Sequence, residues 1–313
     1  MTAGGFPLLQ ADNRLGSGIA MALFPLPSWL TELYPFSPQR FALPGDEGAL
    51  SWVEAGDGPP VVFVHGNPTW SFAFRRLIQG GAEAGFRCLA ADHLGCGLSD
   101  RAADAAMRFT DHSRRWLAWV DAVVGERFHL VVHDWGGPIA LEAMTRQPER
   151  LLSLTILNTG AWVPPFIPAR IALCRWGSFG KWLTWSMNGF AWPATWMTTV
   201  RSLARDVKRG YLYPFAHQAD RRAVWEFVRD IPMEPDHPSR ADLAALDARL
   251  TVLRDVKTQV QWGMRDWCFD PRVLRGWEQR LPEATVVRHA NAGHYVWEDA
   301  EDLAQALVTW WRD

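Results

Sequence analysis

The sequence predicts an α/β fold: a doubly wound, mostly parallel sheet with an inserted helical cap. Two observations lead to this expectation. Short apolar runs alternate with amphipathic stretches along most of the 313 residues, as expected where connecting helices cover both faces of a sheet. Between residues 158 and 258 the alternation stops, and no sheet strand is evident. A structureless loop of that length is unusual inside a domain, so we expect residues 160–240 to form helices over the carboxyl end of the sheet.

Seven short segments are expected to be strands, and several of them are nearly continuous apolar runs, as expected for strands covered on both faces. They are ALSWVEA (49–55), VVFVH (61–65), RCLAAD (87–92), FHLVV (128–132), SLTILN (153–158), TQVQW (258–262) and ATVVRH (284–289). Amphipathic patterns predict helices over 71–78, 110–126, 138–146, 273–281 and 302–312. Strand–helix alternation of this kind indicates a parallel sheet.

Composition narrows the classes of function. The net charge is -2, so the composition does not indicate the positive charge that attracts nucleic acid. None of the four cysteines forms a CxxC pair or a zinc-ligand spacing, so we expect reduced thiols in a cytoplasmic protein. We also expect neither a metal nor an organic cofactor.

Residues 1–34 are expected to form an apolar N-terminal arm. The segment LGSGIAMALFPLPSWL (15–30) has the texture of a weak signal-peptide core, but Pro25 and Pro27 interrupt it, and it is too short to span a bilayer. Two interpretations remain open. The arm packs on the domain or serves as a lid, or it makes a peripheral contact with a membrane or with a partner enzyme of a pathway.

Tryptophan is unusually abundant, with 19 residues, seven of them between Trp162 and Trp225. One interpretation is ordinary packing, because tryptophan buries a large area per residue. The other is an aromatic wall around an apolar ligand. The two interpretations are compatible.

The motif HDWGG carries the first candidate for chemistry. A buried strand pattern stops at His133, and a helical pattern begins just after Asp134 and Trp135. A strand, a sharp turn and a helix form the arrangement that exposes a nucleophile at the top of a sheet, with aspartate here instead of serine. The helix N-terminus stabilises negative charge at that point. The alternative is that Asp134 only caps the helix.

The motif HGNPTWS follows the strand at 61–65. In this architecture the loop there supplies one N–H of an oxyanion hole, and the residue after the nucleophile supplies the other. These would be the backbone amides of Asn67 and Trp135. The Asn67 side-chain amide and the Trp135 indole are also donors, so together they suit a departing anion. The alternative for Asn67 is turn chemistry before Pro68.

His294 and one acid complete the candidate set. His294 lies after the last predicted strand, where the base of such a nucleophile belongs in chain order. No carboxylate follows the strand at 153–158, but Asp266 follows the strand at 258–262. We therefore expect Asp266 to orient His294. Asp270 and Glu298 are less favoured, since each fits a loop or a helix start.

These motifs together resemble a known family. HGNPTWS, DHLGCGLSD, HDWGG, NTGAW, WGMRD and HYVWED resemble the haloalkane dehalogenases of the α/β-hydrolase superfamily, over about residues 35–312. The asparagine after HG, the tryptophan after the nucleophile and the late acid resemble the third dehalogenase subfamily. GCGLSD, NTGAWVPP, FVRDIPMEPDHPS and WGMRDWCFDP are most similar to the bacterial β-lactone decarboxylases of long-chain olefin biosynthesis.

The resemblance implies an α/β-hydrolase core at 35–159 and 241–313, with the cap at 160–240. It also implies roles for the five residues. Asp134 would be the nucleophile, His294 the base and Asp266 the acid, with Asn67 and Trp135 as the anion-binding pair.

The activity implied is the decarboxylation of cis-3,4-dialkyl-β-lactones, apolar small molecules, to cis-alkenes and carbon dioxide. Hydrolysis of haloalkanes to alcohol and halide is the main alternative. An epoxide hydrolase would need cap tyrosines, and Tyr211 and Tyr213 read more simply as packing. A non-catalytic receptor remains as an alternative from another class, although it predicts a damaged set of catalytic residues.

Overall fold

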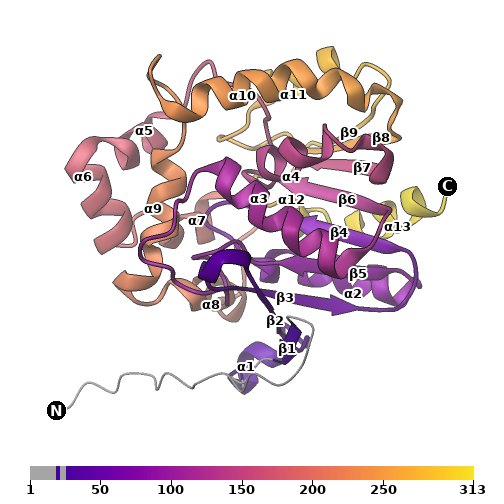
Figure 1. The fold of residues 1–313 in the computed structure, drawn as a ribbon, viewed down its shortest axis with the longest axis horizontal. Coiled ribbons are helices and arrows are strands. Elements are labelled where there is room, and N and C mark those ends of the chain that lie inside the picture. The colour runs from indigo at the N-terminus through magenta and orange to yellow at the C-terminus, as the bar shows by residue number, and fades with distance from the viewer. Residues whose placement is uncertain (1–18, 22–25) are drawn as a thin grey trace.

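The computed structural model describes residues 19–21 and 26–313, and its centre is a nine-stranded sheet (Figure 1). The strand order is β1-β2-β3-β5-β4-β6-β7-β8-β9. Their bounds are β1 (Ile19–Met21), β2 (Gln39–Ala42), β3 (Ala49–Ala55), β4 (Pro60–Val64), β5 (Arg87–Ala91), β6 (Phe128–His133), β7 (Leu151–Leu157), β8 (Thr258–Gly263) and β9 (Thr285–His289). Strands β4 to β9 are parallel, and β1 to β3 are added antiparallel. Strands β3 to β9 confirm the seven predicted segments.

Strands β1 and β2 were not predicted. β2 is only four residues long and pairs with β3, with Phe41 opposite Leu50. A strand so short and so near the sheet edge shows no clear alternation, so the sequence gives little signal for it.

The expected arm lies partly outside the described residues, which omit 1–18 and 22–25. In its described part, Leu30 on helix α1 (Ser28–Thr31) and Tyr34 are fully buried. The Tyr34 hydroxyl lies 2.6 Å from Ser71 Oγ. Residues 30–34 therefore pack on the domain, whereas a membrane or partner contact through the arm stays a prediction.

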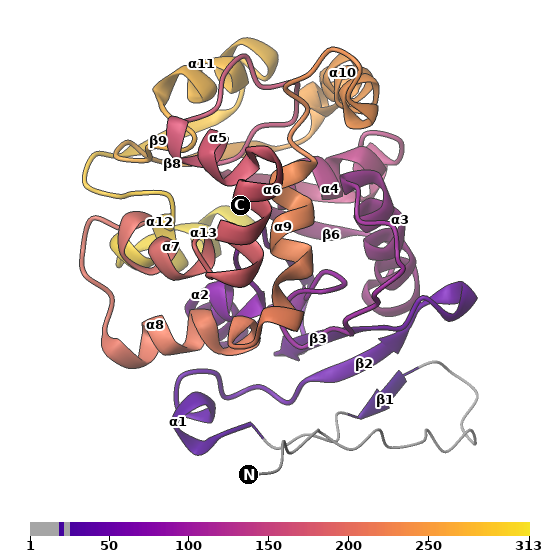
Figure 2. The same cartoon turned by 90° about the vertical axis from the view of Figure 1, so that its left-hand side faces the viewer.

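Helices cover both faces of the sheet (Figures 1 and 2). On one face α2 packs against α13, and on the other α3 packs against α4. The helices of the core are α2 (Arg75–Glu83), α3 (Phe109–Trp119), α4 (Gly136–Met144), α11 (Pro271–Arg280), α12 (Val296–Asp299) and α13 (Leu303–Arg312). Four of these six match predicted helices. The helix expected over 71–78 begins as a 3-10 turn at Ser71–Phe74 and continues as α2 to Glu83, and α12 was not predicted. The helix expected over 110–126 is α3 followed by a π-helical turn, Val120–Val124.

The segment between β7 and β8 is helical, as predicted. It contains α5 (Ala169–Arg175), α6 (Gly177–Lys181), a π-helical turn (Trp182–Ser186), α7 (Ala191–Met197), α8 (Arg205–Leu212), α9 (Arg222–Arg229) and α10 (Pro238–Arg249). Figure 2 shows α5 to α9 gathered on the side that faces the viewer. The expected cap boundary at residue 240 falls inside α10, which packs on α3 and α4. We use the name cap for residues 160–240.

Short 3-10 turns complete the chain at Pro44–Asp46, Ser71–Phe74, Pro148–Arg150, Tyr213–Phe215, Gln218–Arg221 and Leu250–Asp255. Within the described ranges, no helix is long and apolar enough to cross a membrane.

Candidate active site

Asp134 lies in a tight turn between β6 and α4. Its φ angle is +49°, a left-handed conformation that costs free energy for a residue with a side chain. Neighbouring glycines make the turn possible. A Cβ on Gly136 would lie 2.1 Å from the Val64 carbonyl oxygen, and one on Gly66 would lie 2.1 Å from Asp134 Oδ1. The predicted strand–turn–helix arrangement is thus present, and both glycines are needed for it.

The Asp134 side chain does not cap α4. The residue in the N-cap position is Trp135, and no side chain caps this helix. Instead, Asp134 Oδ1 accepts a hydrogen bond of 2.7 Å from the Asn67 backbone N–H, and the Trp135 backbone N–H also donates to the carboxylate. The helix-cap interpretation is therefore wrong. The two amides predicted to form an oxyanion hole both bind Asp134.

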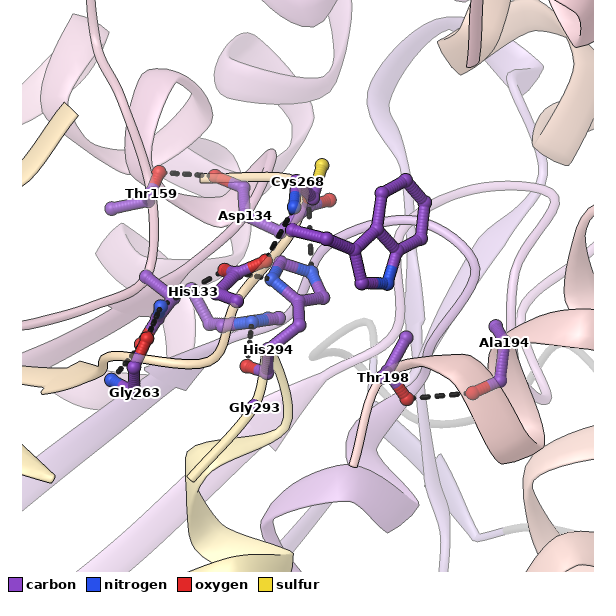
Figure 3. A network of polar contacts seen from close by, with 12 residues as sticks. His133, Asp134, Thr159, Ala194, Thr198, Gly263, Cys268, Gly293 and His294 are labelled. Carbon is purple, nitrogen blue, oxygen red and sulfur yellow. Dashed lines mark hydrogen bonds and ion pairs between the residues drawn. The ribbon is translucent and has the colours of Figure 1, made fainter. Parts of the chain in front are cut away.

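His294 and Asp266 lie beside this carboxylate. His294 Nε2 is 3.8 Å from Asp134 Oδ2, and His294 Nδ1 is 2.8 Å from Asp266 Oδ2. Figure 3 shows the Asp134 and His294 side chains converging from different loops of the sheet's carboxyl edge. The structure brings together the three residues that the sequence singled out.

The two less favoured acids have other partners. Asp270 Oδ1 accepts from the Arg272 backbone N–H at 2.8 Å and caps α11. Glu298 forms a buried ion pair with Arg75 at 2.7 Å. Both carboxylates are thereby held away from His294, as the sequence interpretation expected.

Asn158 is a residue of the site that the sequence did not identify. Its Nδ2 donates to Asp266 Oδ2 at 2.9 Å, and its Oδ1 accepts from the Gly263 backbone N–H at 2.8 Å. Cys268 N–H donates to the other Asp266 oxygen at 2.7 Å. The available signal was a polar residue directly after β7, at the edge where Asp134 also lies.

Burial and charge shift the pKa values of both central groups. Burial raises the pKa of Asp134 above its usual value, and the opposing effects of His294 and the two backbone amides do not cancel this. Burial alone would lower the pKa of His294. The nearby Asp266 and Asp134 carboxylates outweigh burial and raise that pKa.

A cavity of about 500 Å³ opens in front of Asp134. Its wall is formed by core loops and by the cap, and most of its side chains are apolar. The charged or basic side chains in this wall are those of Asp134, His294 and Arg170. An apolar wall with few polar groups suits a hydrophobic small molecule.

Some cap tryptophans line the cavity, and others do not. Trp162 and Trp196 line the cavity, as an aromatic wall would. Trp176, Trp182 and Trp192 are instead exposed on the surface.

The side chains of the expected anion-binding pair both line the cavity. Asn67 Nδ2 donates to the Val224 carbonyl oxygen on α9 at 3.2 Å, so one of its two amide hydrogens is already used. The Trp135 ring packs against Phe227, with centroids 5.7 Å apart. Helix α9 therefore fixes the position of both donors.

Tyr211 and Tyr213 do not belong to the cavity wall. The Tyr211 hydroxyl donates to Glu298 at 2.6 Å and accepts from the Trp297 indole at 2.9 Å. Tyr213 packs edge-on against Trp29. Both contacts agree with a packing role.

The part of the chain that the structure describes contains no group of three or more His, Cys, Asp or Glu side chains placed to hold a metal. Cys88, Cys96, Cys174 and Cys268 are all free thiols.

Comparisons with known proteins agree with this architecture. The family model described as "alpha/beta hydrolase fold" matches residues 59–301. A cis-3-alkyl-4-alkyloxetan-2-one decarboxylase from Shewanella oneidensis is 36% identical, over 87% of both chains. One from Xanthomonas campestris pv. campestris is 33% identical, over 86% of this chain and 94% of that relative.

Haloalkane dehalogenases are also similar. Haloalkane dehalogenase 2 of Mycobacterium tuberculosis is 30% identical, over 88% of this chain and 95% of the relative. The crystal structure of a haloalkane dehalogenase from Bradyrhizobium elkani has the same fold, with a TM-score of 0.79 at 24% identity, over 88% of this chain and 98% of that chain. The chain therefore belongs to the α/β-hydrolase family, in the haloalkane dehalogenase-like group that includes the cis-3-alkyl-4-alkyloxetan-2-one decarboxylases.

Proposed function

We propose that this protein converts cis-3-alkyl-4-alkyloxetan-2-ones, which are β-lactones with two alkyl chains, to cis-alkenes and carbon dioxide. One observation carries the proposal. Asp134 has one carboxylate oxygen, Oδ1, held by the Asn67 backbone amide at 2.7 Å, and it lies on the wall of an apolar cavity of about 500 Å³. The names of the two decarboxylase relatives support the β-lactone as substrate.

The first step is an attack by Asp134 Oδ2 on C4 of the lactone ring. The C4–O1 bond breaks, C4 inverts, and the ring oxygen leaves as part of a carboxylate on C3. This forms an ester between Asp134 and C4. Oδ1 becomes the ester carbonyl and keeps its hydrogen bond to the Asn67 amide. The side-chain donors of Asn67 and Trp135 suit the departing carboxylate.

The second step releases both products. The bond between C3 and the carboxylate breaks, and its electron pair forms the C3=C4 double bond. The C4–Oδ2 bond breaks at the same time and returns Asp134 to its ionised form. No proton, water or oxidant is consumed. Inversion followed by anti elimination converts a cis-lactone to a cis-alkene.

His294 and Asp266 serve this reaction electrostatically. The raised pKa of His294 favours an imidazolium next to Asp134, where it stabilises carboxylate charge before and after the attack. Asp266 orients the ring through the 2.8 Å contact to Nδ1. The apolar wall withholds water from the C3 carboxylate, which favours loss of carbon dioxide.

Haloalkane hydrolysis is the second candidate, because a 30% identical relative is a haloalkane dehalogenase. The first step would be the same, with halide as the leaving anion. The resulting ester has no carboxylate on the neighbouring carbon, so it persists until water attacks it with His294 as the base. The two activities therefore differ in whether water is needed.

The experiment runs two reactions in parallel, with product analysis by gas chromatography. One contains a synthetic cis-3,4-dialkyl-β-lactone, and the other contains 1-bromobutane. We expect alkene from the lactone, reduced at least about a thousandfold in Asp134→Asn. Asp104→Asn, at an exposed position, is the matched control and should retain activity. Alcohol and bromide from the haloalkane with unconsumed lactone would overturn the proposal in favour of the dehalogenase.

A further inference from the structure

Exposed apolar side chains are concentrated on one part of the cap. Among the described residues, ten large apolar side chains are exposed, and eight of them lie between residues 173 and 200. We call these eight the cap patch: Leu173, Trp176, Phe179, Trp182, Met187, Trp192, Trp196 and Val200. Trp176 is 71% exposed. Phe179 packs against Trp176 and Trp182, and Trp192 packs against Trp196, with ring centroids 5.7 to 6.2 Å apart. Exposed apolar side chains gathered in this way mark interaction sites.

The cap patch reaches the mouth of the Asp134 cavity. It runs from α5 through α6 and the turn at Trp182–Ser186 to α7 and the residues just after α7, and these elements face the viewer in Figure 2. Leu173 and Trp196 belong both to the patch and to the cavity wall. An apolar molecule dissolved in an apolar layer that covers the patch can therefore enter the cavity without passing through water.

Basic residues are concentrated in the same segment of the chain as the patch. The segment 170–209 contains seven basic residues and one acid, Asp206, although the chain has a net charge of -2. The basic residues are Arg170, Arg175, Lys181, Arg201, Arg205, Lys208 and Arg209. Arg175 and Arg201 pair with Glu234 and Glu301. Arg170, Lys181 and Arg205 are exposed and form no salt bridge with the residues that the structure describes.

We propose that the cap patch docks on the surface of an anionic lipid bilayer. Tryptophans with apolar bodies and polar N–H groups are favoured at the membrane–water boundary. Basic side chains next to them attract anionic headgroups. A second copy of this chain fits less well, because two such faces would bring like charges together.

Vesicle co-sedimentation without substrate tests the proposal, so its result does not depend on which reaction the protein performs. The vesicles consist of phosphatidylcholine alone or with about one third phosphatidylglycerol. We expect the protein to sediment with the anionic vesicles and to be released by high salt. The variant Trp176→Ser/Trp182→Ser/Trp192→Ser should bind at least about tenfold more weakly. None of these three tryptophans lines the cavity.

The matched control is Val252→Ser/Val287→Ser, which replaces the other two large apolar side chains that are exposed among the described residues. It should bind as the unaltered protein does. A second variant, Lys181→Glu/Arg205→Glu, should lose the preference for anionic vesicles. An unchanged far-UV circular dichroism spectrum and an unchanged midpoint of thermal unfolding show that the tryptophan variant remains folded.

Three results would overturn the proposal. The first is unaltered protein that sediments with neither type of vesicle. The second is a tryptophan variant that binds vesicles as well as the control does. The third is a tryptophan variant that turns a dimer into a monomer in gel filtration without any change in vesicle binding, which would make the patch a contact between copies.

Discussion

The two carboxylate oxygens of Asp134 have different surroundings, and this difference determines which oxygen attacks the substrate. Oδ1 accepts a hydrogen bond from the Asn67 amide at 2.7 Å, so one of its lone pairs is engaged. Oδ2 lies 3.8 Å from His294 Nε2, which is too far for a hydrogen bond. Oδ2 is therefore the oxygen that is free to attack. Oδ1 would become the carbonyl oxygen of the ester, and it already has a hydrogen-bond donor.

The ionisation of Asp134 predicts an acid limit to activity. Only the carboxylate attacks, and burial raises its pKa above the usual 3.8. As the pH falls through that raised pKa, kcat/KM for the lactone should decrease tenfold per pH unit, beginning above pH 3.8. On the alkaline side, kcat/KM should fall above pH 6.5, as the imidazolium that the raised pKa of His294 favours is lost. A kcat/KM profile that stays flat down to pH 3.8 would contradict this assignment.

Replacing His294 should separate the two candidate reactions. In His294→Gln, a haloalkane should form the Asp134 ester but fail to hydrolyse it, because the base that activates water is gone. Intact-protein mass spectrometry would detect the added alkyl group. The lactone should still yield alkene at a reduced rate, since its ester collapses without water. His217→Gln, on an exposed residue, is the control. An ester trapped from the lactone as well would show that His294 is needed for collapse.

The candidate catalytic residues were easier to predict from the sequence than the residues that hold them in place. Asp134, His294 and Asp266 follow strands, and their chain order indicates that their side chains meet at one edge of the sheet. Asn158 lies 108 residues from Asp266 along the chain. Its hydrogen bond to Asp266 depends on the relative heights of β7 and β8, which no local pattern encodes.

The cap and the His294 loop are joined by buried hydrogen bonds. Asp299, on α12, accepts from the Gly293 backbone N–H at 2.8 Å and from those of Val200 and Arg201 at 2.9 Å. Tyr295 N–H donates to the Thr198 carbonyl oxygen at 3.0 Å. The segment after α7 and the loop that carries His294 are thus held by one carboxylate.

Removing that carboxylate should weaken both stability and turnover. Asp299→Ala leaves three backbone N–H groups without their acceptor, which should cost about 2–4 kcal/mol of unfolding free energy in urea titrations. It should lower kcat more than KM, because His294 loses its support while the cavity wall remains. Asp302→Ala is the control, since Asp302 is exposed and does not cap α13 with its side chain. Equal losses in the two variants would contradict the coupling.

Helix and strand positions were predictable where the periodicity was long and regular. Strands β4, β6 and β7 are mostly apolar. The prediction missed the bounds of β4 to β8 by no more than two residues. The helix expected to end at residue 126 stops at Val124, because Gly125 takes a φ of +109°. Helix α10 was divided by the expected cap boundary, since its pattern gives no indication that it packs on α3 and α4.

The cavity depends on how the cap sits over the sheet, and this arrangement is set by long-range packing. The sequence indicated several helices and many aromatic residues between 160 and 240. It did not indicate that Trp162 and Trp196 face the cavity while Trp176 and Trp192 face outwards. Short helices broken by Gly177 and Gly189 carry too little periodicity to define an inner face.

The apolar cavity predicts how the activity depends on the length of the alkyl chains. Each methylene moved from water into an apolar wall contributes about 0.8 kcal/mol, which corresponds to about a fourfold gain in kcat/KM. We expect that gain for each added carbon until the two chains fill the space of about 500 Å³, and a plateau beyond that length. A series of cis-β-lactones of increasing chain length, presented at concentrations below micelle formation, would measure it. In Gly160→Val, an added Cβ would meet Val273 and Phe269 at ordinary contact distances of 3.5 and 3.6 Å, so the branched side chain should fit and reduce the cavity. The plateau should then come at shorter chains, and a plateau unchanged in this variant would show that the alkyl chains lie elsewhere.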